Sequence, residues 1–318
     1  MGSSASQEQK EGGLLSALLS TLARFGAALL NSSAIVFVCI GLLFPVELVR
    51  RSGGYKRSRT RWPAPIAFCE ALATEPPELD AEAAEQFVKH LLLFAPRVSF
   101  KLAAYGMVVR SMSAPYRPYA KAYGTTAIVA GAVAAAVAQL LYAFPFKRIE
   151  HDEAVRMGSA QGLAGRMREL IRFEGVGRLY HGVTAAVPYA VVHSLVLFFS
   201  LESIADNDRL GERVPHGVLR SFSASFVAVI LAALMAAPLE QLRQIMVAHP
   251  LDYNEFLYKP GSNKVDPDMR MLGDYVVHTM RRWTRGGPLR MMGHINLEVN
   301  SVELALALAL HHLSLGAR

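Results

Sequence analysis

The sequence predicts an all-α membrane protein with six transmembrane helices. Hydrophobic residues make up 52% of the 318 positions and charged residues only 19%, which is apolar for a soluble protein and still leaves room for polar loops. Six apolar windows approach or reach the roughly 20 residues that cross a bilayer as a helix, and an even number of crossings places both termini on one side. The windows are 25–44, 91–112, 122–144, 189–203, 218–237 and 297–315, of which the second and the last are the weakest.

The net charge of +7 comes largely from basic residues just beyond the apolar windows. Such flanks set topology and face anionic lipid headgroups. No nucleic-acid-binding motif accompanies them, so we expect membrane lipids and not nucleic acid as partners. The two cysteines, Cys39 and Cys69, form neither a disulfide framework nor a metal site.

Histidines in the windows do not indicate an enzyme. His193, His311 and His312 have no acid, thiol or metal ligand at a useful spacing. Adjacent residues on a helix point about 100° apart, which is poor geometry for one metal ion. We therefore predict no catalysis, no metal and no cofactor apart from bound lipid.

A motif that ends the first apolar window recurs twice. A proline in a span frees a backbone carbonyl and bends the helix, so Pro45, Pro145 and Pro238 would kink three helices toward a common axis. A glycine-spaced pattern follows two of the copies. The first motif reads FPVELVR at 44–50, FPFKRIE at 144–150 and APLEQLR at 237–243; the second reads EGVGRLYHG at 174–182 and RGGPLRMMG at 285–293.

Three copies at a period of about a hundred residues resemble the mitochondrial carrier family over residues 20–316. The resemblance implies a barrel of six tilted helices in three pseudo-symmetric repeats. It also implies the mitochondrial inner membrane, with both termini toward the intermembrane space. The chain would divide into a polar tail at 1–20 and repeats at 21–115, 116–208 and 209–318, together one six-helix domain.

In that family, the acid and base of the proline motif form a ring of salt bridges on the matrix side. Repeat two is reversed here, with Lys147 at the acid's position and Glu150 at the base's. One attractive and two repulsive pairings remain, and two unit charges about 4 Å apart interact by roughly 4 kcal/mol at an effective dielectric of about 20. We expect a weakened gate. Its residues are Glu47, Arg50, Lys147, Glu150, Glu240 and Arg243.

The family's second gate uses an aromatic residue, an acid and a base on each even helix. The matching stretches begin at Tyr105, Leu201 and His311, and Glu202 alone supplies a charge of the expected kind. We therefore expect this gate to be lost.

Substrate contacts of the family correspond here to Leu93, Tyr189, Ala190 and Asn300. None is basic, whereas a carrier of nucleotides or carboxylates needs fixed positive charge for its anion. Nearby ionisable groups are functional candidates because charge within a span is costly, although they can also pair with each other or lie near an interface. The candidate cavity residues are Leu93, Arg97, Lys101, Tyr189, Ala190, His193, Asn300 and Glu303.

Gly182 and Gly293 close the two glycine-spaced motifs. Family members often bind cardiolipin at the helix N-termini that follow, where free backbone N–H groups favour an anionic headgroup. We predict these two positions as lipid-headgroup sites.

Two functions of different classes remain. The degenerate gates and the apolar contact positions favour a transport-impaired structural or accessory subunit of a larger inner-membrane complex, with other membrane-protein subunits as partners. The repeat pattern by itself favours an active carrier that moves a small metabolite by alternating access. A divergent outer-membrane homologue is a further alternative.

Overall fold

Helix is the only regular secondary structure in the described part of the chain. The structure, a computed structural model, describes residues 3–51, 57–58, 64–74, 81–113, 124–145, 163–180, 183–205, 217–248 and 299–316. The helices are α1 (Ser3–Arg51), α3 (Ala64–Thr74), α4 (Ala81–Ser113), α5 (Thr125–Ala138), the π-helix η2 (Gln139–Ala143), α7 (Leu163–Glu174), the 3-10 helix η3 (Val176–Tyr180), α8 (Val183–Ala205), α10 (Gly217–Ala248) and α13 (Val299–Gly316).

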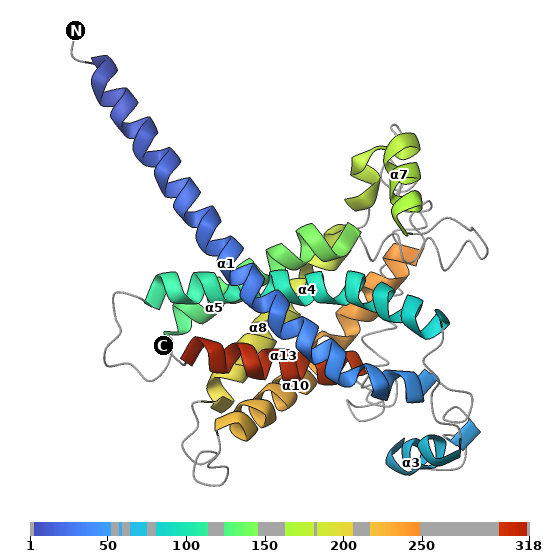
Figure 1. Ribbon diagram of the computed structural model, residues 1–318. Coiled ribbons are helices and arrows are strands. Elements are labelled where there is room, and N and C mark those ends of the chain that lie inside the picture. The colour runs from blue at the N-terminus through green and yellow to red at the C-terminus, as the bar shows by residue number, and fades with distance from the viewer. Residues whose placement is uncertain are drawn as a thin grey trace, which may run out of the picture.

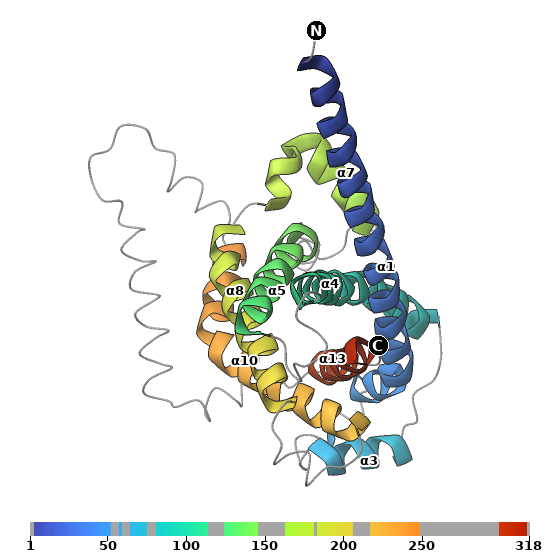
Figure 2. The same ribbon diagram turned by 90° about the vertical axis from the view of Figure 1, so that its left-hand side faces the viewer.

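Six of these helices form a closed ring in chain order. Each of α1, α4, α5, α8 and α10 packs on the next, and α10 packs on α13. The ring closes because α13 returns to α1, and both views show these first and last helices side by side (Figures 1 and 2). Every ring helix therefore has two neighbours and one side turned inward.

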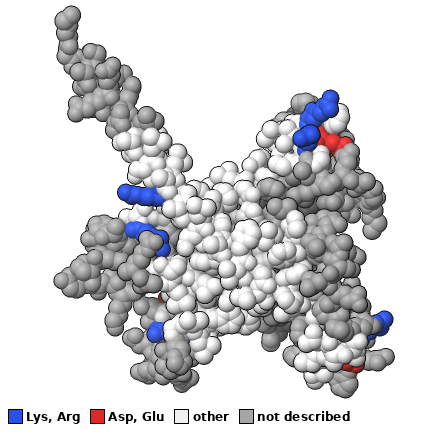
Figure 3. All heavy atoms as spheres, in the orientation of Figure 1, with Lys and Arg blue, Asp and Glu red and all other residues white. Residues whose placement is uncertain are grey.

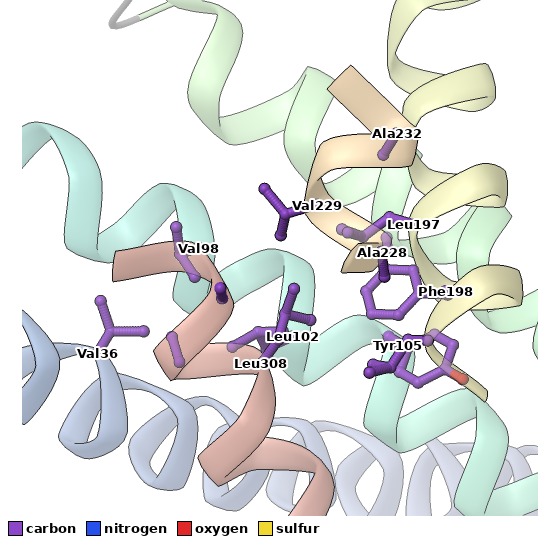
Figure 4. Packing of buried hydrophobic residues seen from close by; sticks show 14 of the residues in the cluster. Val36, Val98, Leu102, Tyr105, Leu197, Phe198, Ala228, Val229, Ala232 and Leu308 are labelled. Carbon is purple, nitrogen blue, oxygen red and sulfur yellow. The ribbon is translucent and has the colours of Figure 1, made fainter. Parts of the chain in front are cut away.

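A single hydrophobic cluster occupies the centre of the ring. All six ring helices contribute to it, and its largest fully buried side chains are Tyr105 and Phe198. Alanines on α5 and on α10 allow each of these helices to approach its own ring neighbours closely. Figure 4 shows Val36, Val98, Leu102, Leu197, Val229 and Leu308 among the side chains that converge there.

The outward surface of the ring is apolar. Large hydrophobic side chains on α1, α5 and α10 are exposed, including Leu42, Val133 and Met235. In the view of Figure 3, a broad uncharged surface separates charged groups near the two ends. This is the surface expected of helices that lie against lipid hydrocarbon.

Four of the six predicted spans are confirmed as helices that are long and apolar enough to cross a membrane. They are Ser16–Val46, Thr125–Tyr142, Ala186–Ala205 and Gly217–Glu240. The two weakest windows also form helices. However, α4 carries Arg97, Lys101 and Arg110, and the apolar part of α13 is limited to Leu304–Leu315.

Helix boundaries differ from the predicted ones in two places. The segment 1–20, predicted as a polar tail, is helical from Ser3 and is continuous with the first span. The second window, predicted at 91–112, is part of α4, which begins ten residues earlier and runs without a break from Ala81 to Ser113.

The three motif prolines all lie in or beside helices. Pro45 and Pro238 are inside α1 and α10, which continue past them to Arg51 and Ala248. Pro145 is buried just after the π-helical turn η2. A π-helical turn shortly before a proline shows that the backbone hydrogen-bond pattern changes at this position.

Candidate functional site

Two of the predicted cavity residues meet inside the ring. The Nζ atom of Lys101 on α4 lies 3.0 Å from Nδ1 of His193 on α8, and the lysine is 5% exposed. A charged Lys101 can only donate hydrogen bonds, so with the lysine protonated Nδ1 accepts and the imidazole proton resides on Nε2. The ring of Phe198 lies below the same ammonium, with its centroid 6.0 Å from Nζ.

A second polar contact crosses the ring one turn further along α4. The hydroxyl of Tyr105 donates to Oε1 of Glu202 on α8 over 2.7 Å, and both side chains are buried. The other carboxylate oxygen, Oε2, lies 3.6 Å from Nε2 of His312 on α13. Glu202 is thus shared between α4 and α13, and a protonated imidazole would complete an ion pair with it.

Arg110 links α13 back to α4. Its guanidinium donates from an Nη atom to the backbone carbonyl of Ser314 over 3.3 Å. The two helices also approach closely at Gly106, where a Cβ atom would come within 3.0 Å of the His311 ring. These contacts join α4, α8 and α13 pairwise, and we call the side chains of Lys101, Tyr105, Arg110, His193, Glu202 and His312 the interior polar cluster.

In the ring order, α8 is next to neither α4 nor α13. The side-chain contacts of α8 with these two helices therefore pass through the interior of the ring. The Tyr105 and Phe198 rings stack there with centroids 3.7 Å apart and planes 7° apart. Leu102, Leu197 and Leu308 belong to the same buried hydrophobic cluster as the Tyr105 ring and Phe198 (Figure 4).

The stretches predicted for the second gate are brought together by the structure. A tyrosine, a glutamate and a histidine from these stretches, on three separate helices, meet at this point. Tyr105 is the first residue of its stretch and Glu202 the second of its own, but the pairing of this acid with a tyrosine and a histidine required the fold.

The remaining predicted cavity residues lie on the same three helices, α4, α8 and α13. Arg97 is half-buried on α4, whereas Ala190 is buried on α8 beside the half-buried Tyr189. The Tyr189 and His193 rings lie 5.4 Å apart between centroids. Leu93 lies on α4, and Asn300 and Glu303 lie on α13, but these three side chains are outside the described ones.

Most of the predicted charge ring falls outside the described side chains. Glu240 is half-buried on α10. The side chains of Glu47, Arg50 and Arg243, and the whole of Lys147 and Glu150, lie outside the described part of the chain, as do Gly182 and Gly293. The charge ring and the lipid-headgroup sites therefore stay predictions.

A contact that sequence reasoning missed ties the second proline motif to its downstream loop. Pro145 has no N–H, so the carbonyl of Leu141, four residues earlier, loses its usual helical donor. The hydroxyl of Tyr180 in η3 donates to that carbonyl over 2.8 Å. Tyr180 belongs to the glycine-spaced motif, in which Gly175 has a positive φ of 80° and ends α7.

The described helices define an all-α protein with four helices that are long and apolar enough to span a membrane. In the described residues, no three His, Cys, Asp or Glu side chains are placed to hold a metal ion. No protein-family model matches the chain, and no curated protein sequence matches it significantly.

Proposed function

We propose that this chain is a structural or accessory subunit of a larger membrane complex, built on a carrier-like barrel that no longer transports. In this proposal the six ring helices are six spans in three repeats. The ring order of the helices and the recurrence of the proline motif support this architecture.

The observation that carries the proposal is the buried apolar cluster that all six ring helices share. A translocation path needs polar, hydrated space between the helices, whereas here one apolar cluster contains side chains from every ring helix. Tyr105 and Phe198, at 1% and 0% exposure, stack at its centre. Helices joined by one shared apolar cluster suit a subunit that presents its outer surface to partners.

The mitochondrial inner membrane is the proposed location, with both termini toward the intermembrane space. The location comes from the family resemblance. Support for a shared side comes from Figure 1, in which the N-terminal end of α1 and the C-terminal end of α13 lie on the same side of the ring. Separation of inner and outer membranes, followed by detection of the chain, tests the location against the outer-membrane alternative.

Native gel electrophoresis of gently solubilised membranes tests the structural role. We expect the chain to migrate in a complex far heavier than its own 34.7 kDa. Replacing Lys101 by Met should leave this migration unchanged, because a structural subunit needs no buried cation for a solute. Migration of the wild-type chain only as a free monomer would refute the proposal.

The Lys101–His193 pair supports an active solute carrier as the second candidate. A cation within the ring could attract an anionic metabolite, and its partner His193 is only half-buried. Purified protein in liposomes, loaded with carboxylates or nucleotides, would then exchange solute, and Lys101→Met would abolish the exchange. We expect no exchange above protein-free liposomes.

A further inference from the structure

The contact of Tyr105, Glu202 and His312 lies close to the C-terminal ends of three helices. Glu202 is in the last turn of α8, and His312 is in the last two turns of α13. Tyr105 lies about two turns before the end of α4. The contact is therefore at the end of the ring at which Figure 1 marks the C-terminus.

Two titratable side chains join α8 to α13 at this end. The two helices are not neighbours in the ring order, so a contact between them has to cross the interior. Oε2 of Glu202 and Nε2 of His312 make such a contact, 3.6 Å apart. The strength of this link depends on the charges that the two groups carry.

α4 is joined to both helices by contacts that need no titrating group. The Tyr105 ring on α4 stacks on the Phe198 ring of α8, with centroids 3.7 Å apart. On the other side, Arg110 donates to the backbone carbonyl of Ser314 on α13. Loss of the contact between α8 and α13 would therefore leave each of these helices attached to α4.

The buried carboxylate of Glu202 needs a partner for its charge. Its side chain is 8% exposed, and an unpaired charge at such a site is costly. The Tyr105 hydroxyl supplies a neutral donor to Oε1, and a protonated His312 would supply the opposite charge beside Oε2. The pair is therefore best satisfied when it holds one proton between Oε2 and Nε2. Without that proton, a buried carboxylate faces a neutral ring.

His312 is the residue through which the pair can gain and lose this proton. Its side chain is 24% exposed, so it can exchange a proton with the surroundings. Histidine is also the side chain whose charge ordinarily changes between about pH 5 and pH 8. The neighbouring His311 is only 4% exposed, and a charge there would be costly to bury.

The other helices that pack on α13 carry fixed cations. They are α1, α4 and α10, whose described residues include Arg24, Arg110 and Arg220. A guanidinium group is not deprotonated in proteins. These cations therefore add no pH dependence of their own to the link between α8 and α13.

We propose that the Glu202–His312 pair is a proton-controlled latch that ties α8 to α13 and closes this end of the ring. The latch is closed while the pair holds one proton. As pH rises and the proton leaves to the solvent, α8 and α13 move apart here, and α4 keeps its contacts with both. The inference goes beyond the proposed structural role, because it concerns the shape of the ring whether or not the chain belongs to a larger complex.

Distances between spin labels on the full-length chain in liposomes test this movement. The labels are attached to cysteines placed at Ser203 on α8 and Leu313 on α13, and Cys39 and Cys69 are replaced by alanine. We expect this distance to be longer by about 2 Å or more at about pH 9 than at about pH 6. The matched pair of Ser203 with Met112 on α4 should keep its distance.

Two histidine variants of the labelled chain identify the titrating group. His312→Gln keeps an amide donor beside Glu202 but cannot change its charge, so it should abolish the pH-dependent lengthening. His193→Gln removes a histidine that contacts Lys101 instead of Glu202, so it should leave the lengthening unchanged.

A double-mutant cycle at two pH values tests the pair without labels. Glu202→Gln keeps an acceptor for the Tyr105 hydroxyl and removes the negative charge. Its coupling with His312→Gln, measured from unfolding midpoints, should be about twofold or more larger at about pH 6 than at about pH 9. Titration of other groups cancels because all variants are compared at the same pH.

Several outcomes would overturn the latch. They are a Ser203–Leu313 distance that does not change with pH, a change that persists in His312→Gln, and equal coupling at both pH values. Equal lengthening of the Ser203–Met112 distance would show general loosening of the ring and would also overturn it. None of these measurements involves the heavy complex, so the latch and the structural role can fail separately.

Discussion

Removing the Tyr180 hydroxyl should destabilise the protein only as long as Pro145 is present. The hydroxyl donates over 2.8 Å to the carbonyl of Leu141, which has no helical N–H from position 145. The Tyr180→Phe variant keeps the aromatic ring and leaves this carbonyl without its donor. A single such hydrogen bond is worth about 1 kcal/mol net.

A double-mutant cycle isolates this hydrogen bond. Pro145→Ala restores an N–H that can donate to the Leu141 carbonyl, so Tyr180→Phe should then cost close to nothing. The expected coupling free energy is therefore about 1 kcal/mol. For a chain of this size it corresponds to a difference of about 2 °C in the midpoint of thermal unfolding.

The assay can use the chain's own cysteines. Of the two, Cys39 is buried in the ring and Cys69 is exposed. In a Cys69→Ser background, reaction of a maleimide dye with Cys39 during heating reports opening of the ring in detergent. Equal costs for Tyr180→Phe with and without Pro145 would show that the tyrosine does not compensate for the proline.

Three further substitutions test the packing of the ring with the same Cys39 assay. Gly131→Ala should cost about 1–3 kcal/mol, because its Cβ would come within 2.8 Å of Tyr105 and Val109; its matched control, Gly26→Ala, has nothing within 4 Å and should stabilise the helix by up to about 1 kcal/mol. Equal shifts would contradict close contact of α5 with α4. Tyr105→Phe should cost about 1–3 kcal/mol by removing the donor to buried Glu202, and a loss that persists in a Glu202→Leu background would disprove this cause. Phe198→Ala should cost about 3–5 kcal/mol because it empties the stacked centre of the core, and a midpoint close to wild type would show that the centre is not packed.

The sequence predicted well those features that depend on single residues and short windows. Four apolar spans were readable because hydropathy belongs to each side chain and a bilayer demands a minimum length. The positions of the three motif prolines could likewise be read directly from the sequence. The start of α1 could not be predicted in this way, because the run from Gln7 to Glu11 consists of good helix formers and extends the helix of the first span through Gly12 and Gly13.

Which helices are neighbours in the ring, and which face of each turns inward, could not be predicted from single residues or short windows. Apolar residues lie on every side of α5 and of the central part of α10, so their periodicity does not mark which face turns inward. The Lys101–His193 pair illustrates the consequence. Both residues are cavity candidates by sequence, but the sequence does not show that they contact each other.

The sequence by itself determined the all-helical class, four of the apolar spans and the recurring proline motif. Only the tertiary structure decided that the six helices close into a ring, that Glu202 joins Tyr105 to His312, and that Tyr180 compensates for Pro145. Residues 39 positions apart, as in the last case, or 97 apart, as Tyr105 and Glu202 are, meet only after the helices pack. Local patterns set the elements because neighbouring residues constrain each other's backbone and burial, whereas the contacts between elements follow from the one arrangement that buries all their inward faces together.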